Sequence, residues 1–198
     1  MLSGDVELDD FFLDSRDRSR GRRSGRGTDG QPMICAVQRA RGGRGRCVVR
    51  AVPDCSGATY RRFAEEHIDR SAHVRADGLP SIGAGLRGFP GLDRRKFDGS
   101  DPDASLPTVH HVISNFEAWA LGTFHGLPLT RLQSYADEFS WRYSHRGGDA
   151  TTALLADCCA GYYSRDQLKR EVFLPQPVPP KPPKRPRGRP RKHPILQL

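Results

Sequence analysis

Residues 108–119 have the sequence Thr-Val-His-His-Val-Ile-Ser-Asn-Phe-Glu-Ala-Trp, and residues 122–126 follow with Gly-Thr-Phe-His-Gly. Apolar residues recur in this stretch at intervals of three and four, which is the spacing of one face of an α-helix. The stripe consists of Val109, Val112, Ile113, Phe116 and Ala120. The pattern therefore predicts an amphipathic helix that packs on a hydrophobic core, with Gly122 as its C-terminal cap.

Strand-forming segments come before this helix. Three of them, rich in β-forming and apolar residues, occupy residues 6–13, 33–37 and 47–52. Loops rich in Gly and Arg separate them, which predicts an antiparallel meander. Residues 58–68 then have helical spacing, and residues 73–76 read as a short strand that ends at Asp77-Gly78. A helix followed by a new strand is typical of a strand added in parallel to the sheet.

The rest of the chain is less regular. Residues 79–107 are dense in Gly, Pro and Asp, and we expect a loop there with room for one short element. Thr130 is placed to cap a helix with apolar spacing from Leu132 onward, and residues 149–160 predict one further short helix. From Leu174 onward the frequent prolines exclude regular structure.

Composition limits the class of protein. The chain has 198 residues with 36% hydrophobic content, 21 Gly and 16 Pro, which suits one folded domain with tails that do not fold alone. It contains no apolar run long enough to span a bilayer and no basic-then-apolar leader. The five cysteines form no Cys-x-x-Cys pair and are typical of a reducing compartment. We expect a cytoplasmic protein that is not bound to a membrane.

Basic residues gather at the C-terminal end. Residues 172–198 hold seven Lys and Arg and no acidic residue, within a chain of net charge +9. Residues 184–192 resemble an AT-hook, whose extended Arg-Gly-Arg-Pro core enters a narrow minor groove. The candidate DNA-binding residues are Arg185, Arg187, Gly188, Arg189, Arg191 and Lys192. A non-specific basic tail explains the motif about as well. The arginines of residues 16–26 are either further phosphate contacts or a solvated loop.

Three stretches together resemble the ISXO-type insertion-sequence transposases, a branch of the DDE superfamily. Residues 108–119 resemble the family's C-terminal signature. Val6-Glu7-Leu8-Asp9-Asp10 resembles its first catalytic strand, and Val74-Arg75-Ala76-Asp77-Gly78 resembles its second. The resemblance covers about residues 5–146 and implies an α/β, ribonuclease-H-like domain over residues 1–146, with a mixed sheet, flanking helices and a flexible loop at 14–31. We expect a weakly structured extension at 147–172 and a disordered tail at 173–198.

The resemblance implies a metal site built on two strands. Strand cleavage is an in-line displacement at phosphorus, which divalent ions held by carboxylates promote. Asp9 and Asp77 are the candidate catalytic carboxylates and ligands for Mg²⁺ or Mn²⁺. Either one alone is better explained as a surface or turn Asp; the ordered set of landmarks favours the site. The third catalytic member aligns with His110, and Glu117, two helical turns on, stays an alternative.

The function implied is cleavage of DNA at the ends of an insertion sequence and joining of the freed 3′-hydroxyl to target DNA. DNA is the expected partner, in association with the bacterial nucleoid, and assembly as a homo-oligomer on the DNA stays open. The family has a further region before its first catalytic strand, so we expect an N-terminally truncated chain, either active or decayed. The alternatives are a non-catalytic DNA-binding relic acting through the tail, and a metal-dependent nuclease that does not join strands.

Overall fold

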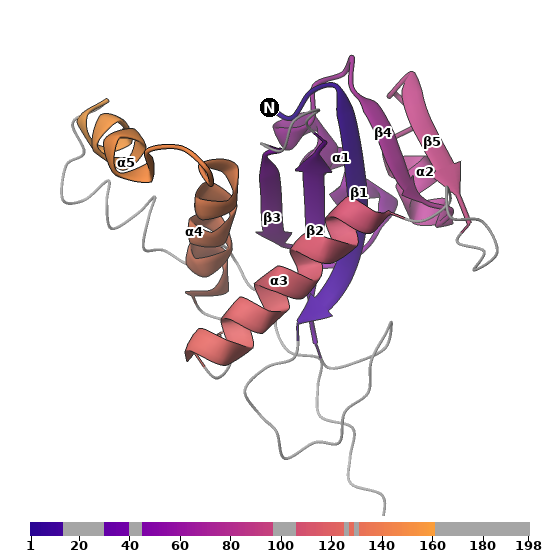
Figure 1. The fold of residues 1–198 in the computed structure, drawn as a ribbon. Coiled ribbons are helices and arrows are strands. Elements are labelled where there is room, and N and C mark those ends of the chain that lie inside the picture. Colours follow the sequence, from indigo (N-terminus) through magenta and orange to yellow (C-terminus); the bar gives the residue numbers. More distant parts are fainter. Residues whose placement is uncertain (14–29, 40–44, 97–105, 125–126, 129–130, 161–198) are drawn as a thin grey trace, which may run out of the picture.

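The computed structural model describes residues 1–13, 30–39, 45–96, 106–124, 127–128 and 131–160. In chain order its elements are β1 (Asp5–Leu13), β2 (Gln31–Gln38), β3 (Cys47–Ala51), α1 (Gly57–His67), β4 (His73–Asp77), α2 (Pro80–Gly85), β5 (Gly91–Arg95), α3 (Pro107–Phe124), α4 (Leu132–Ser144) and α5 (Ala150–Cys159) (Figure 1). The loop at 16–26, Thr130 and the basic tail, on which several sequence predictions fall, lie outside the described residues.

The sheet has five strands in the order β3-β2-β1-β4-β5. β1 pairs antiparallel with β2, and β2 with β3, which confirms the predicted meander. β4 is parallel to β1, as the helix-then-strand order predicted, and β5 is parallel to β4. The fold is α/β and ribonuclease-H-like, a mixed sheet with flanking helices (Figure 1).

Side chains alternate between the two faces of the sheet, so each face has its own core. The core under α1 and α2 takes from the strands Val6, Leu8, Ile34, Ala36, Val74 and Ala76. The core under α3 and α4 takes Phe11, Leu13, Met33, Cys35, Val37 and Val49. The helical stripe predicted from Val109 to Ala120 is buried in this second core, which confirms the predicted face of α3.

Two predictions about local structure were wrong. The segment 79–107 was expected to hold one short element, but it contains both α2 and β5. Three of the five residues of β5 are charged, so its sequence carries no apolar strand pattern, and its backbone pairing with β4 makes it a strand. Gly122 is not a cap, because α3 continues to Phe124 and Gly122 lies inside the helix.

The free edge of β3 is covered by one face of α4. Gln133 accepts a hydrogen bond from the Ala51 N–H through Oε1 at 2.8 Å and donates to the Val49 carbonyl at 3.2 Å. Further along the helix, Ser140 and Ser144 accept from the N–H groups of Val49 and Cys47. These side chains satisfy edge amides that an exposed strand would leave open to other chains.

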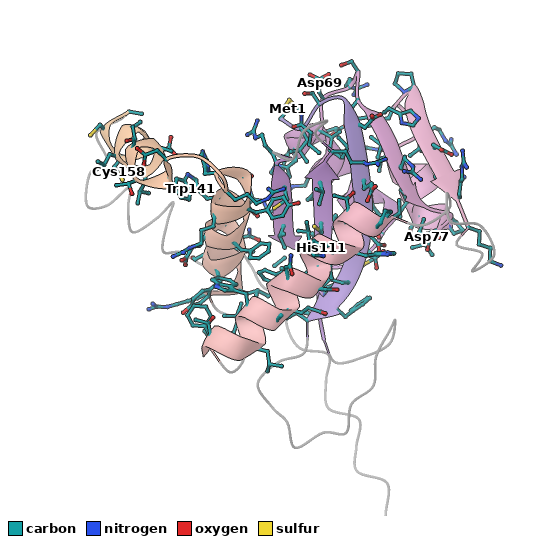
Figure 2. The ribbon with its side chains drawn as sticks, viewed as in Figure 1. Met1, Asp69, Asp77, His111, Trp141 and Cys158 are labelled. Atoms are coloured by element: carbon teal, nitrogen blue, oxygen red, sulfur yellow. The ribbon has the colours of Figure 1, made fainter. Side chains whose placement is uncertain are left out.

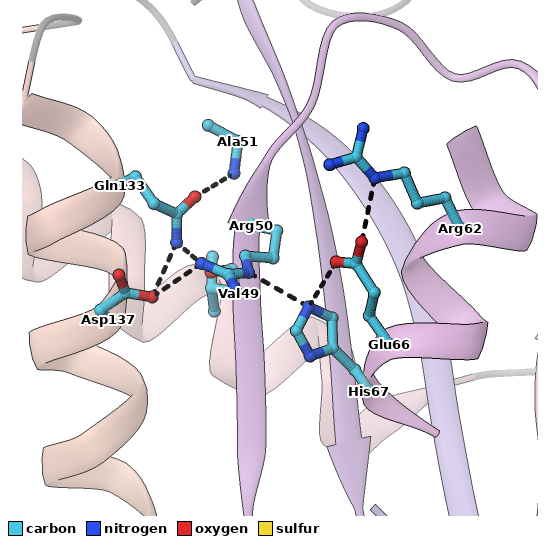
Figure 3. A network of polar contacts seen from close by, with 8 residues as sticks. All are labelled: Val49, Arg50, Ala51, Arg62, Glu66, His67, Gln133 and Asp137. Atoms are coloured by element: carbon cyan, nitrogen blue, oxygen red, sulfur yellow. Dashed lines mark hydrogen bonds and ion pairs between the residues drawn. The ribbon is translucent and has the colours of Figure 1, made fainter. Parts of the chain in front are cut away.

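A polar network continues this contact around β3 (Figure 3). Asp137 on α4 accepts from Gln133 at 2.8 Å and forms an ion pair with Arg50 at 3.3 Å. On its other side, Arg50 donates from Nε to Nε2 of His67 at 3.1 Å. The network therefore ties α4, β3 and the end of α1 together.

The predicted helix at 149–160 is confirmed as α5. Asp149 caps it by accepting from the N–H groups of Thr151 and Thr152. The Trp141 indole of α4 donates to Asp157 of α5 at 2.7 Å. None of the residues of α5 is buried.

Candidate active site

The first strand carries its acidic residues on different faces. Asp9 lies on the α3 side, because it is two residues from Phe11, whose side chain belongs to that core. Asp10 points the other way and accepts a hydrogen bond from the Tyr60 hydroxyl of α1 at 2.5 Å. Of these two adjacent residues, therefore, Asp9, which the sequence analysis selected, faces α3.

His110 and Asp9 are in direct contact. Nε2 of His110 lies 3.0 Å from Oδ2 of Asp9, across 101 residues of sequence. The Asp9 side chain is only 18% exposed, whereas His110 is 51% exposed. The contact thus has one protected carboxylate and one imidazole open to solvent. Its neighbour His111 is also exposed on α3, and Figure 2 labels it together with Asp77 at the end of β4.

The surroundings of Asp9 disfavour an unpaired negative charge. Burial raises the pKa of Asp9 above its ordinary value, the hydrogen bond from the Asp10 N–H lowers it, and the negative charge of Asp10 adds to the rise. The His110 imidazole opposes the rise. A carboxylate in this position gains from any nearby positive charge, either a protonated imidazole or a cation.

Glu7 places His110, although it was not among the predicted site residues. Its carboxylate is fully buried and accepts from the N–H groups of Thr108 and Val109 at 2.8 and 2.9 Å. Those N–H groups belong to the first turn of α3, where a helix leaves its donors without internal partners and favours negative charge. The only signal in the sequence was position: Glu7 precedes Asp9 by two residues and so shares its face of β1.

Asp77 ends β4, next to Asp9 in the sheet. The parallel register pairs Leu8 with Ala76, so Asp9 and Asp77 follow at the same level of neighbouring strands. Oδ1 of Asp77 accepts from the Gly78 N–H at 2.6 Å. A Cβ at Gly78 would lie 3.0 Å from both N and Cα of Lys96, so a larger residue there would press on the backbone of the segment after β5. Asp77-Gly78 is therefore a strand end packed against a neighbour.

The Asp9–His110 contact offers two of the ligands that a divalent cation would need. Adjacent ligands of an octahedral Mg²⁺, each at about 2.1 Å, lie about 3 Å apart. The 3.0 Å separation of Oδ2 and Nε2 would suit two such ligands, and in this structure it is the length of a hydrogen bond. Within the residues that the structure describes, no three His, Cys, Asp or Glu side chains group closely enough to hold a metal. Asp77 would complete a site only by turning its carboxylate away from Gly78. Glu117 is exposed, two turns along α3.

The comparison with protein families decides the identity of the domain. Residues 1–144 match the family model described as ISXO2-like transposase domain. The chain belongs to this family. The match includes all three stretches on which the resemblance rested and ends at the last residue of α4. None of the curated proteins compared with this chain matches it.

Membership of the ISXO2-like transposase family supports a transposase function and a DNA partner. The DDE transposases, to which it belongs, generally use divalent metals. Among the described helices, none is both long and apolar enough to cross a membrane.

Proposed function

We propose that this ISXO2-like transposase domain cleaves DNA at the ends of an insertion sequence and joins them to target DNA with the help of Mg²⁺ or Mn²⁺. Asp9 and Asp77 would hold the metal, and His110 would complete the site. The observation that carries the proposal is the contact of His110 with Asp9, on a strand whose parallel neighbour ends in Asp77 at the same level. Asp9, Asp77 and His110 come from β1, β4 and α3, and the proposal needs the Asp77 carboxylate to turn from Gly78 toward the other two.

Each side chain has a distinct task. The bound ion would supply Lewis acidity for an in-line displacement at phosphorus. Asp9 provides a largely buried carboxylate that accepts a hydrogen bond from the Asp10 N–H. His110 borders this carboxylate from the solvent side, where it can bind the cation or exchange a proton with the reacting oxygen. Glu7 keeps His110 in register by anchoring the first turn of α3.

The basic tail and the division of the chain extend the same proposal. We assign catalysis to residues 1–146, a connecting role to 147–172, and DNA attachment to 173–198. In the tail, the alternation of Arg, Gly and Pro at residues 187–190 suits minor-groove contact, and its charge suits phosphate contact. The tail would keep the domain on DNA without choosing the cleavage site.

Metal binding tests this proposal directly. Mn²⁺ is titrated by calorimetry into the wild-type chain and into Asp9→Ala, Asp77→Ala and His110→Ala. The control is Glu138→Gln, which removes an exposed carboxylate on α4. Binding that Asp9→Ala and Asp77→Ala both weaken at least tenfold, and that Glu138→Gln leaves unchanged, is the expected result. Binding that is absent, or equally strong in all variants, would overturn the metal site.

Catalysis is then measured as nicking of a supercoiled plasmid and as joining of a labelled 3′-hydroxyl end, with and without Mn²⁺. We expect Mn²⁺-dependent nicking that the two Asp variants abolish and Glu138→Gln retains. Nicking without joining would identify a nuclease in place of a transposase. Metal binding without either activity would refute catalysis by this chain.

A further inference from the structure

The α3 side of the sheet has a covered half and an open half. α3 packs against β1 and β2, and α4 packs against β3, so the core on this side contains no residue of β4 or β5 among the described residues. In Figure 1, β4 and β5 extend beyond α3 at the edge of the sheet. Apart from His73 at the start of β4, the side chains on the open half are charged: Arg75, Asp77, Asp93 and Arg95. We call these four residues the open charged face.

The strand register aligns this face with the proposed metal site. Asp77 pairs with Arg95, and Arg75 pairs with Asp93. Because Asp9 and Asp77 each follow the paired residues Leu8 and Ala76, Asp9, Asp77 and Arg95 lie at one level on three successive strands. Neighbouring strands are about 4.8 Å apart. Arg95 is therefore the next side chain after Asp77 in the row that begins with Asp9.

Arg95 is accessible and oriented. Its side chain is 51% exposed, and its Nε forms an ion pair with Asp93 at 3.2 Å. Asp93 lies two residues earlier on the same face of β5, so the contact holds the guanidinium along the strand. An exposed arginine held beside a carboxylate site suits recognition of a phosphate, because its planar N–H groups match the phosphate oxygens.

We propose that Arg95 binds a backbone phosphate of the DNA strand that enters the site, and so positions the scissile phosphodiester over Asp9 and Asp77. The proposal rests on the proposed function, which it deepens by naming a DNA contact on the folded domain, apart from the basic tail. The phosphate would lie on the open charged face, beside the part of the sheet that α3 covers. The contact requires no particular base, because it addresses the backbone.

The neighbouring residue provides a matched control. Arg94 lies on the opposite face of β5, where its NH1 donates to the Leu79 carbonyl at 3.1 Å. A Cβ at Gly83 of α2 would lie 2.4 Å from the same guanidinium, so the Arg94 side chain lies against α2. Removing either arginine lowers the net charge equally at nearly the same place. Only Arg95 faces the proposed site.

The first measurement is the salt dependence of DNA binding. A fluorescein-labelled 30-base-pair duplex is titrated with the full chain in metal-free buffer at several NaCl concentrations, and anisotropy gives Kd. We expect Arg95→Ala to weaken binding by up to about tenfold and to reduce the slope of log Kd against log salt by about 0.9, the contribution of one phosphate contact. Arg95→Lys should keep the slope. Arg94→Ala should match the wild type in both Kd and slope.

Thermal unfolding of each variant accompanies the titration, so that a folding defect is recognised. A slope unchanged in a folded Arg95→Ala variant would overturn the proposal. An equal loss in Arg94→Ala would also overturn it, because the effect would then reflect general charge. The assay needs no metal and no catalysis, so it tests Arg95 even if the proposed metal site fails.

Nicking of a supercoiled plasmid with Mn²⁺ is the second measurement. If the wild type nicks DNA, Arg95→Ala should raise KM for plasmid while Arg94→Ala does not, and Arg95→Lys should restore part of the loss. Equal kinetics in Arg95→Ala and wild type would contradict a contact with the reacting strand. Absence of nicking in the wild type would refute the proposed function. The salt dependence of DNA binding would then be the test of the Arg95 contact.

Discussion

The buried carboxylate of Glu7 accepts a hydrogen bond from the backbone N–H of Val109 at 2.9 Å. A second bond at 2.8 Å reaches it from the N–H of Thr108, so β1 holds the first turn of α3. Arg39 and Arg75 lie 3.5 and 3.9 Å from the same carboxylate. Because His110 follows Val109 directly, the anchor that stabilises the fold also determines where the imidazole stands relative to Asp9.

Glu7→Gln should lower the free energy of unfolding by about 2–4 kcal/mol, because its amide group would place a donor among buried donors. Urea unfolding at pH 7.5 measures the change. The control Glu66→Gln removes a carboxylate from an exposed pair with Arg62 and should cost under about 0.5 kcal/mol. A Glu7→Gln variant as stable as the control would show that the contact does not anchor α3.

Two glycine substitutions should change stability in opposite directions. Gly78→Ala should destabilise by about 1–3 kcal/mol, since the added Cβ would push against the Lys96 backbone at 3.0 Å. Gly122→Ala should stabilise by about 0.5–1 kcal/mol, because Gly122 lies inside α3 with no atom within 4 Å of the added Cβ. Melting temperatures of the two variants give the comparison. Destabilisation by Gly122→Ala would mean that α3 ends earlier.

Stability should fall in mild acid because of His67. Burial, followed by the charge of Arg50, lowers the pKa of His67 to about 4. Between about pH 6.5 and 4 the unfolded chain holds the proton and the folded protein does not, so stability is complete above pH 6.5 and is lost as the pH falls. The full shift corresponds to ~3 kcal/mol, which solvent screening at this partly exposed site reduces to ~1–2 kcal/mol.

Urea unfolding at pH 7.5 and pH 4.5 checks this dependence. His67→Gln keeps an acceptor for Arg50 and should reduce the loss between the two pH values, whereas His111→Gln, on the exposed side of α3, should not. The same loss in wild type and His67→Gln would assign the acid sensitivity to other groups.

Gln133→Ala should open the edge of β3. The side chain is buried and bonded to Ala51 and Val49, so its removal leaves an N–H and a carbonyl unpaired at a cost of about 1–3 kcal/mol. Amide hydrogen exchange gives a local readout, and the Ala51 amide should exchange faster than in the wild type. Glu138→Ala, on an exposed position of α4, should leave that amide protected. Unchanged exchange at Ala51 in the Gln133 variant would disprove the edge contact.

Sequence patterns predicted the helices and strands whose own residues have a regular apolar spacing. The meander, the helix before β4, the parallel placement of β4 and the stripe of α3 follow from apolar spacing, because burial of one face imposes that spacing locally. Asp9 and Asp77 were found through motifs, and the family match covers those motifs. Their catalytic roles, the role of His110 and the function of the basic tail stay predictions.

Other features left no local pattern. β5 consists mostly of charged residues and forms a strand because its backbone pairs with β4. Its own residues therefore gave no indication of a strand. Nothing in the sequence distinguishes Glu7 from an ordinary strand residue. The N–H groups that donate to its carboxylate belong to Thr108 and Val109, which come 101 and 102 positions later. Gln133 covers β3 for a similar reason: its partners lie more than 80 positions earlier.

The sequence by itself determined the periodic elements, the class of fold and the family, because these depend on spacing and on short motifs. Only the tertiary structure decided that His110 meets Asp9, that Glu7 anchors α3, and that Arg95 follows Asp77 in one row across the sheet. Those relationships depend on strand register and helix placement. Both arise when distant segments bury a common core and pair their backbones, and residue spacing within one segment contains no information about either.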